Sequence, residues 1–142
     1  MEVVMGMQKL KLRIDWGDMD LLGHVNNVSI IRYLQAGRVM FMEKIGLPAY
    51  AGMKTGPIEA ATEIQFRKQL YFPGNVEVRT GVREVKNTSI ILEHEVYDDA
   101  GDLAVSGMEV IVHFDFTNQC KIPLTDELRE NIVRYCDSLV EL

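Results

Sequence analysis

One segment of about twenty residues limits the folds available to this chain more than any other feature. Residues 27–46, NVSIIRYLQAGRVMFMEKIG, are apolar around most of their circumference at helical spacing, and Ser29, Arg32, Gln35 and Lys44 form only a thin polar set. A helix of that length is about 30 Å long. Because a helix that is apolar on nearly every side has to be covered, the rest of the chain is expected to wrap around it.

Most of the remaining sequence alternates apolar and polar residues, which is the pattern of half-buried strands. Strands are predicted at residues 8–16, 58–72, 76–83, 88–98 and 103–115. The short turn KN and the hairpin signal DDAG separate the last three strands, so these strands are antiparallel.

A second helix is predicted in residues 123–142, PLTDELRENIVRYCDSLVEL, with Thr125 as its N-cap. Its apolar stripe consists of Leu128, Ile132, Tyr135, Cys136 and Leu139. The order strand, long helix, four strands, helix favours an α+β protein in which the central helix packs on one antiparallel sheet.

Length and charge narrow the class of protein. The chain has 142 residues, the size of one domain, so residues 1–142 are expected to share a single core. A net charge of −6 and a pI near 5.0 argue against a nucleic-acid binder. No apolar run reaches the roughly 18 residues that suggest a membrane span. The start, MEVVMGMQKLKLR, lacks a signal-peptide pattern, and Cys120 and Cys136 have no CxxC spacing, so we expect a cytoplasmic protein.

The candidate chemistry lies directly before the long helix, in DMDLLGHVNN at residues 18–27. The sequence contains no GxSxG, GxGxxG, phosphate-loop or HExxH motif. A calcium loop is disfavoured because Leu22 stands where a third oxygen ligand is required and Ser29 where the closing Glu belongs. The three histidines have no ligand spacing, so no metal site is expected.

A helix that begins near Asn27 offers the ingredients of acyl transfer. If Asn26 or Asn27 is the cap, the backbone N–H groups near Asn27 and Val28 favour negative charge in the loop that carries Asp20. Such groups stabilise an oxyanion by on the order of 3 kcal/mol per donor. Asp20 can then act as general base or nucleophile. Asp and Asn are equally favoured in an ordinary turn and cap, so the residues alone leave both interpretations open.

A family resemblance covers most of the chain, from about Lys9 to Pro123. The stretches RIDWGDMDLLGHVNNVSIIRYLQAGR and FRKQLYFPGNVEVRTGVREVKNTSIILEHEVYDDAGDLAVSGMEVIVHFD resemble hotdog-fold thioesterases of the 4-hydroxybenzoyl-CoA thioesterase type, a group that includes acyl-CoA thioesterases. The most specific part is D-x-D-x-x-G-H-V-N-N with Tyr33 and Arg38 downstream. The resemblance implies a long central helix wrapped by an antiparallel sheet of about five strands, and active sites between paired subunits.

The resemblance also implies roles for individual residues. Asp20 matches the catalytic carboxylate, and Asn27 matches the residue whose backbone N–H polarises the thioester carbonyl. Three motif positions are expected to have positioning roles: Asp18, Gly23 and His24. The turn KNTS matches a region that touches the nucleotide part of coenzyme A. Candidates for phosphate contact are therefore Lys86, Thr88 and Ser89, with Arg67 and Lys68 as a second choice.

The main hypothesis is hydrolysis of an acyl thioester, with acyl-CoA as the expected substrate and no cofactor or metal. The alternative is a non-catalytic acyl-CoA binding or sensing subunit. A hydratase or dehydratase is less favoured, because no motif pairs a His with an acidic residue in the way those enzymes do. Open edge strands are a liability unless they are paired, so we expect a homodimer or a homotetramer.

Overall fold

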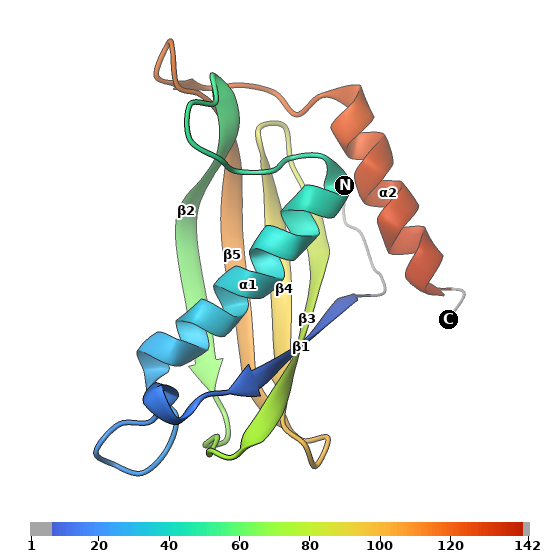
Figure 1. Cartoon of the computed structure of the whole chain (residues 1–142). Coiled ribbons are helices and arrows are strands. Elements are labelled where there is room, and N and C mark those ends of the chain that lie inside the picture. The colour runs from blue at the N-terminus through green and yellow to red at the C-terminus, as the bar shows by residue number, and fades with distance from the viewer. Residues whose placement is uncertain (1–6, 141–142) are drawn as a thin grey trace.

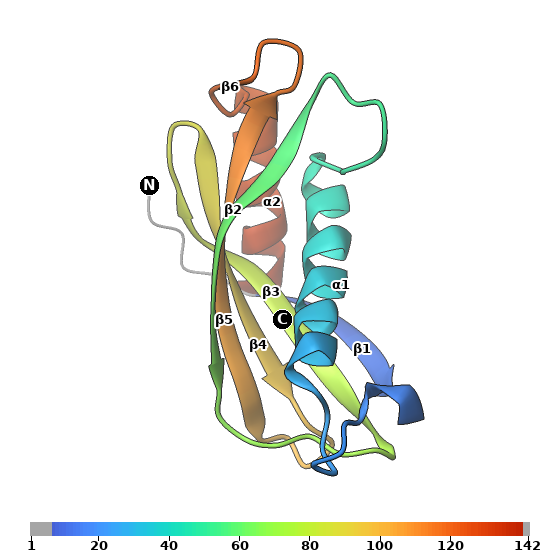
Figure 2. The ribbon, with the colours of Figure 1, turned by 90° about the vertical axis from the view of Figure 1, so that its left-hand side faces the viewer.

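The long helix and the sheet around it are both present in the computed structural model, which describes residues 7–140, and for residues 136–140 the backbone alone (Figure 1). Over this part of the chain the sheet curves around α1, Asn27–Ile45, and α2, Asp126–Val140, lies beside α1 on the same face of the sheet (Figures 1 and 2). The predicted positions of the Cys136 and Leu139 side chains, and the whole N-terminal segment MEVVMG, lie outside the described residues.

The described strands form one antiparallel sheet in the order β1-β3-β4-β5-β2, and a short β6 also pairs with β5. Their bounds are Gln8–Ile14 for β1, Thr55–Phe66 for β2, Gly74–Val85 for β3, Ser89–Tyr97 for β4, Leu103–Asp115 for β5 and Cys120–Lys121 for β6. The predicted α+β class is confirmed. The two long edges of the sheet belong to β1 and β2.

The ends of α1 follow from its sequence. The Asn26 side chain accepts a hydrogen bond of 2.8 Å from the Val28 N–H, which caps the first turn. At the other end Gly46 adopts φ 87°, a left-handed conformation that favours glycine, and the Leu47 N–H bonds back to the Met42 carbonyl. Both predicted ends of this helix are therefore confirmed.

The core fills the space between the inner face of the sheet and the two helices. From α1 it takes Tyr33, Leu34, Phe41, Met42 and Ile45, which are all buried. Leu128 and Ile132 of α2 join the same core near the end of α1. The opposite flank of α1 differs from the prediction that the helix would be covered all round, because Ile31 and Val39 remain 45% and 46% exposed.

Helix and sheet approach most closely at Gly37. A Cβ atom there would stand 2.7 Å from both Thr80 Oγ1 and Val78 Cγ1 on β3. Real Cβ atoms do not come that close to their neighbours, so a larger residue would push α1 away from the sheet. Glycine thus fixes how closely the middle of α1 lies over β3.

Two predicted strands end earlier than their alternation indicates. β1 stops at Ile14, and a single helical turn, Trp16–Asp18, follows it. β2 stops at Phe66, because the chain then turns inward until Leu70 is buried and accepts a hydrogen bond from the Val25 N–H at 2.8 Å. This turn brings residues 66–70 next to the loop before α1.

Candidate active site

The loop before α1 is anchored on the buried carboxylate of Asp18. Asp18 Oδ2 accepts hydrogen bonds from the Tyr33 hydroxyl at 2.7 Å and from the Asp15 N–H at 2.9 Å. The Asp18 carbonyl accepts from the Asn26 N–H at 2.9 Å. Burial, and then the bond to Asp18, raise the pKa of Tyr33 well above its ordinary value, so this hydroxyl keeps its proton. Asp18 therefore ties both ends of the loop to α1.

Asp20 begins the exposed part of this loop. Its backbone N–H bonds to the His24 carbonyl at 3.2 Å, and its carbonyl accepts from the Gly23 N–H at 3.1 Å. Gly23 has φ 85°, the conformation that lets the chain reverse here. Asp20 Oδ1 accepts the Leu22 N–H at 2.8 Å, whereas Oδ2 accepts no hydrogen bond within the described residues. One carboxylate oxygen is thus held in place, and the other is available.

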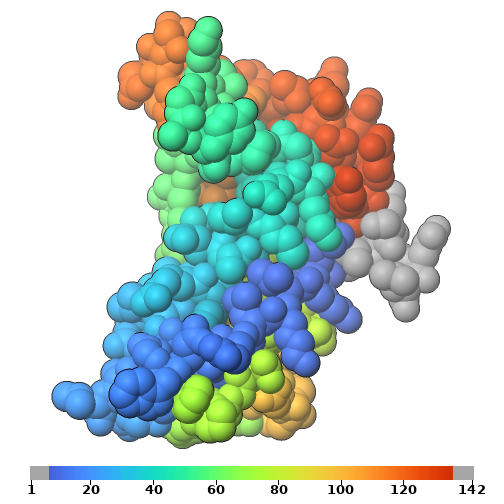
Figure 3. All heavy atoms as spheres, viewed as in Figure 1, coloured from blue at the N-terminus to red at the C-terminus, as the bar shows by residue number. Residues whose placement is uncertain are grey.

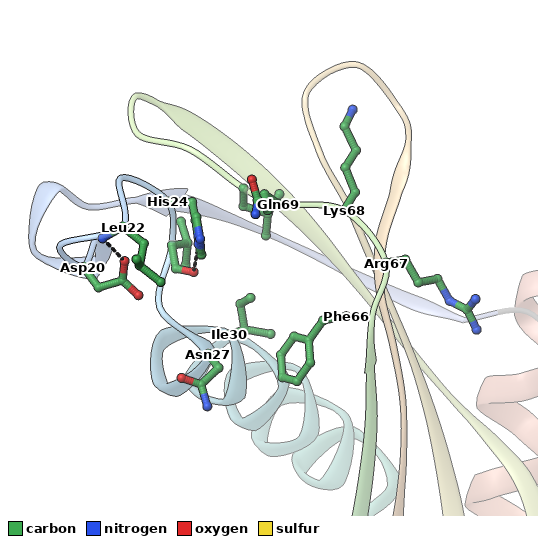
Figure 4. Close-up of a pocket in the computed structure, with 11 residues that line it drawn as sticks. Asp20, Leu22, His24, Asn27, Ile30, Phe66, Arg67, Lys68 and Gln69 are labelled. Carbon is green, nitrogen blue, oxygen red and sulfur yellow. Dashed lines mark hydrogen bonds between the residues drawn. The ribbon is translucent and has the colours of Figure 1, made fainter.

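A cavity of about 470 Å³ lies between this loop, the first turn of α1 and residues 66–70 (Figure 4). Its polar lining includes Asp20, His24, Asn27 and Gln69, and Ile30 and Phe66 contribute apolar side chains (Figure 4). The structure therefore brings Asp20, His24 and Asn27 together at one cavity beside a helix N-terminus.

The backbone donors at the start of α1 differ from one another. The Val28 N–H is not free, contrary to the expectation from the sequence, because it donates to the capping side chain of Asn26. For the Asn27 N–H, no hydrogen bond is present in the described part of the chain. Asn27 therefore provides an available donor in this first turn, where the helix dipole also favours negative charge.

The side chains of Arg67 and Lys68 point away from the cavity, although the backbone of both residues borders it (Figure 4). Arg67 Nε donates to Ser106 Oγ at 2.9 Å. Lys68 Nζ donates to Asp102 at 2.7 Å and to Asp98 at 2.6 Å, and these two carboxylates raise the pKa of Lys68. Both cations are therefore engaged elsewhere.

Lys86, Thr88 and Ser89 lie at the opposite end of the sheet from Asp20, in and after the turn between β3 and β4 (Figure 1). This turn packs against the start of α2, where Arg129 Nη2 donates to the Lys86 carbonyl at 2.8 Å. Within a single chain the turn and the cavity are separated by the length of β3, which is roughly 37 Å for a strand of this size. One copy of the chain does not bring these predicted residues together with Asp20.

A buried polar network crosses the inner face of the sheet beneath α1, and the sequence interpretation missed it. His94 Nε2 lies 2.7 Å from Glu109 Oε1, and Thr80 Oγ1 lies 2.8 Å from His94 Nδ1. Arg38 Nη1 donates to Glu109 Oε2 at 2.6 Å and to Glu59 Oε2 at 2.7 Å. His94 and Glu109 occupy inward-facing positions of β4 and β5, where an apolar residue is the rule. That breach of the alternation was the available signal.

The network sets the ionisation of its carboxyl groups. Burial by itself opposes ionisation of Glu109, but hydrogen bonds with His94, Glu59 and Arg38 outweigh it and lower the pKa of Glu109 to about 2. Burial and the neighbouring Glu109 carboxylate raise the pKa of Glu59. Glu109 is therefore ionised at neutral pH although it lies inside the core.

Two further properties concern the described residues alone. They contain no group of three or more His, Cys, Asp or Glu side chains that could hold a metal ion. Neither α1 nor α2, over the range that the structure describes, is long and apolar enough to cross a membrane.

Tyr33→Phe is expected to lower the free energy of unfolding by about 1–3 kcal/mol, because the buried Asp18 carboxylate loses a hydrogen-bond donor. Urea unfolding followed by circular dichroism measures the difference. Tyr50→Phe is the matched control, since Tyr50 is 67% exposed. Equal unfolding midpoints for Tyr33→Phe and the wild type would show that the anchor contributes nothing.

Comparison with known proteins places the site in context. The family model described as the thioesterase-like superfamily matches residues 14–132. The PA2801 protein of Pseudomonas aeruginosa, described as a candidate thioesterase, is 26% identical with a TM-score of 0.80 over 87% of this chain and 96% of that one. BH1999 gentisyl-coenzyme A thioesterase is 27% identical with a TM-score of 0.76, over 86% of this chain and 99% of that one. A thioesterase of Thermus thermophilus, solved with coenzyme A and Zn, is 22% identical with a TM-score of 0.80, over 92% of this chain and 93% of that one. Among curated proteins, no sequence matches this chain significantly.

Proposed function

The chain belongs to the thioesterase-like superfamily and has the hotdog fold, and from this premise we propose that it hydrolyses an acyl thioester, with acyl-CoA as the substrate. One observation carries the proposal. The carboxylate of Asp20 and the first turn of α1, with the available Asn27 N–H, line the same cavity. A base and an oxyanion donor beside one cavity are what acyl transfer to water requires.

In the proposed mechanism the thioester carbonyl oxygen accepts a hydrogen bond from the Asn27 N–H. The positive end of the α1 dipole favours the charge that develops on this oxygen as water attacks the carbonyl carbon. Asp20 takes the proton of the attacking water, or attacks the carbon itself and is then released by water. The C–S bond breaks, and the thiolate leaves and takes up a proton.

Other motif residues have positioning roles in this proposal. Asp20 Oδ1 is fixed by the Leu22 N–H, which leaves Oδ2 to act on water. Gly23 allows the reversal that presents Asp20, and Asp18 ties the loop to Tyr33. His24 lines the cavity, and its Nδ1 lies 3.4 Å from the Val25 carbonyl, which supports a role in orienting the loop.

The choice of coenzyme A as the thiol is supported by two similar structures. One was solved with coenzyme A, and the other is named as a gentisyl-coenzyme A thioesterase. Because Lys86, Thr88 and Ser89 lie far from the cavity of their own chain, their proposed contact with the nucleotide phosphates requires a second subunit. Arg67 and Lys68 could contribute only after leaving their present partners.

Free-thiol release tests the proposed activity. We expect free thiol to be released when the wild-type protein is incubated with members of a panel of aliphatic and aromatic acyl-CoAs, and a disulfide reagent detects it. The alternative function, a non-catalytic acyl-CoA binding or sensing subunit, predicts heat of binding in calorimetry without thiol release. Absence of both thiol release and binding for every panel member would contradict both functions.

We further propose that two or more copies associate. Within the described residues β2 has no strand on its outer side, and its residues from Glu59 to Glu63 are exposed. The uncovered side chains of Ile31 and Val39 lie on α1. Edge-to-edge pairing at β2 would satisfy the free backbone groups and help to bury this flank.

Sedimentation velocity is expected to give a particle of two or four chains. Hydrogen exchange adds a local readout, since the outward backbone N–H groups of β2 should be protected in the assembly and exchange faster as it dissociates on dilution. A particle of one chain at every concentration would contradict the proposed pairing. So would fast exchange of the outward β2 N–H groups that does not depend on concentration.

A cytoplasmic location is also proposed. Cys120 is free and exposed, and a surface thiol of this kind is maintained in a reducing compartment. Cell fractionation checks it, since recovery outside the cytoplasm would contradict it.

A further inference from the structure

The flank of α1 that faces β2 changes from apolar to charged along its length. At the active-site end, Ile30 and Phe66 line the catalytic cavity, and Ile64 of β2 packs into the neighbouring core. Further along α1, Arg38 donates hydrogen bonds to Glu59 of β2 and to Glu109 of β5. Beside them is a second cavity of about 120 Å³, lined by Arg38, Val39, Met42, Ala49, Pro57, Glu59 and Ile111. In the space-filling view, the surface is hollowed between α1 and β2 (Figure 3).

The charged end of this groove is held in place from behind. Glu109 is 1% exposed and is fixed by His94, which in turn contacts Thr80. Arg38 is therefore bonded to an anchored carboxylate, and swinging out of the groove would take a permanently charged partner away from the buried Glu109. On the β2 side, Glu59 also accepts a hydrogen bond from the Thr62 hydroxyl.

We propose that Arg38 and Glu59 form a polar stop at the far end of an acyl groove, so that the protein takes acyl groups of medium length and rejects long saturated ones. The inference rests on the proposed function. The rise along α1 from Asn27 to Arg38 is about 16 Å. An extended chain advances about 1.2 Å per bond, so the groove holds roughly a dozen carbons.

Desolvation explains why the stop discriminates against long chains. The side chains of Arg38 and Glu59 are still 22% and 33% exposed, so water satisfies part of their hydrogen-bonding capacity. A methylene chain that passes over them displaces this water and offers no hydrogen bond in return. A chain that ends before Arg38 buries its carbons against Ile30, Ile64 and Phe66 without that cost.

The length dependence of kcat/KM for saturated acyl-CoAs, at concentrations below micelle formation, tests the stop. We expect kcat/KM to rise from butanoyl- to octanoyl-CoA and to fall about tenfold or more from dodecanoyl- to hexadecanoyl-CoA. A kcat/KM for hexadecanoyl-CoA as high as that for octanoyl-CoA would overturn the proposal.

A substrate pair tests the chemistry of the stop without any variant. The kcat/KM for ω-hydroxydodecanoyl-CoA should exceed that for tridecanoyl-CoA about tenfold, since its hydroxyl can bond to Arg38 and Glu59. Equal rates would overturn it too.

Substitutions test the residues. Glu59→Met removes one charge of the stop and leaves Arg38 paired with Glu109, so the ratio of kcat/KM for hexadecanoyl- over octanoyl-CoA should rise about tenfold. Glu63→Met, the same substitution on the opposite face of β2, should leave the ratio unchanged. An unchanged ratio in folded Glu59→Met would overturn the role of Glu59. If Glu59→Met does not fold, the hydroxylated substrate pair decides.

Failure of the stop can be distinguished from failure of the proposed function. If no acyl-CoA releases thiol, hydrolysis is contradicted, and the same length series is then measured as binding by calorimetry. Tighter binding of dodecanoyl- than of hexadecanoyl-CoA would still support the stop. Tighter binding of hexadecanoyl-CoA, or binding of no member, would overturn it.

Discussion

Asp20→Asn is expected to lower kcat for acyl-CoA hydrolysis by about 10²–10⁴-fold, the usual contribution of a general acid–base group, and by at least as much if Asp20 is the nucleophile. Asparagine has nearly the same size and keeps the Oδ1 atom that accepts the Leu22 N–H. The loop should therefore keep its shape while the charge is lost. Thiol-release kinetics measure the activity, and circular dichroism verifies the fold.

Asp15→Asn is the matched control for this variant. Asp15 belongs to the same segment, but its side chain is 62% exposed and pairs with Arg13, outside the cavity. It is expected to hydrolyse acyl-CoA at close to the wild-type rate. Full activity in Asp20→Asn, or an equal loss in both variants, would remove Asp20 from the chemistry.

The largest effect on stability is expected for Glu109→Gln, which should lower the free energy of unfolding by about 3 kcal/mol at neutral pH. The substitution breaks a buried ion-pair network by removing one charge, and the partly exposed Arg38 and the buried His94 lose their common carboxylate. Urea unfolding of both proteins measures the loss. Glu93→Gln, on the exposed face of β4, is the control and should be neutral.

The same pair of proteins makes a prediction about pH. The pKa of Glu109 falls from an ordinary 4.5 to about 2 in the folded protein, so its ionised form stabilises the fold. This contribution is fully present above about pH 4.5 and is lost as the pH falls towards 2. The difference in unfolding free energy between wild type and Glu109→Gln should therefore shrink over that range. A difference that grows on acidification would contradict the charged state assigned to Glu109.

Local sequence signals predicted the elements of the fold well. The caps of α1 at Asn26 and Gly46 depend on neighbouring residues alone, and the structure has both. Alternation located the five longer strands for the same reason, since side-chain direction repeats along each strand. The two-residue strand β6 is too short to show a period, and it was not predicted.

Features that depend on distant contacts were predicted less well. The end of β2 at Phe66 reflects the pairing of Leu70 with the loop before α1, which no local pattern of residues 58–72 reveals. The orientation of Lys68 depends on two carboxylates beyond β4, Asp98 and Asp102. His94 and Glu109 each break the alternation of their own strand, but that they lie next to each other follows only from the registers of β4 and β5.

The proximity of the candidate site residues was predictable where they belong to one continuous segment. Asp18, Asp20, Gly23, His24 and Asn27 lie within ten residues, and a loop held on a helix N-terminus keeps such residues close together. By contrast, the turn that contains Lys86 was grouped with them by resemblance, and a single chain keeps it at the far end of the sheet. Its contribution depends on the proposed association of subunits.

Cleavage of an acyl-CoA in water enriched in oxygen-18, followed by mass spectrometry of the acyl product, tests thioester hydrolysis most directly. Water is the final acyl acceptor whether Asp20 acts as base or nucleophile, so we expect free acid that carries the heavy oxygen, together with free coenzyme A. An acyl-CoA that remains intact, or an acyl group recovered without the label on another acceptor, would contradict thioester hydrolysis by this protein.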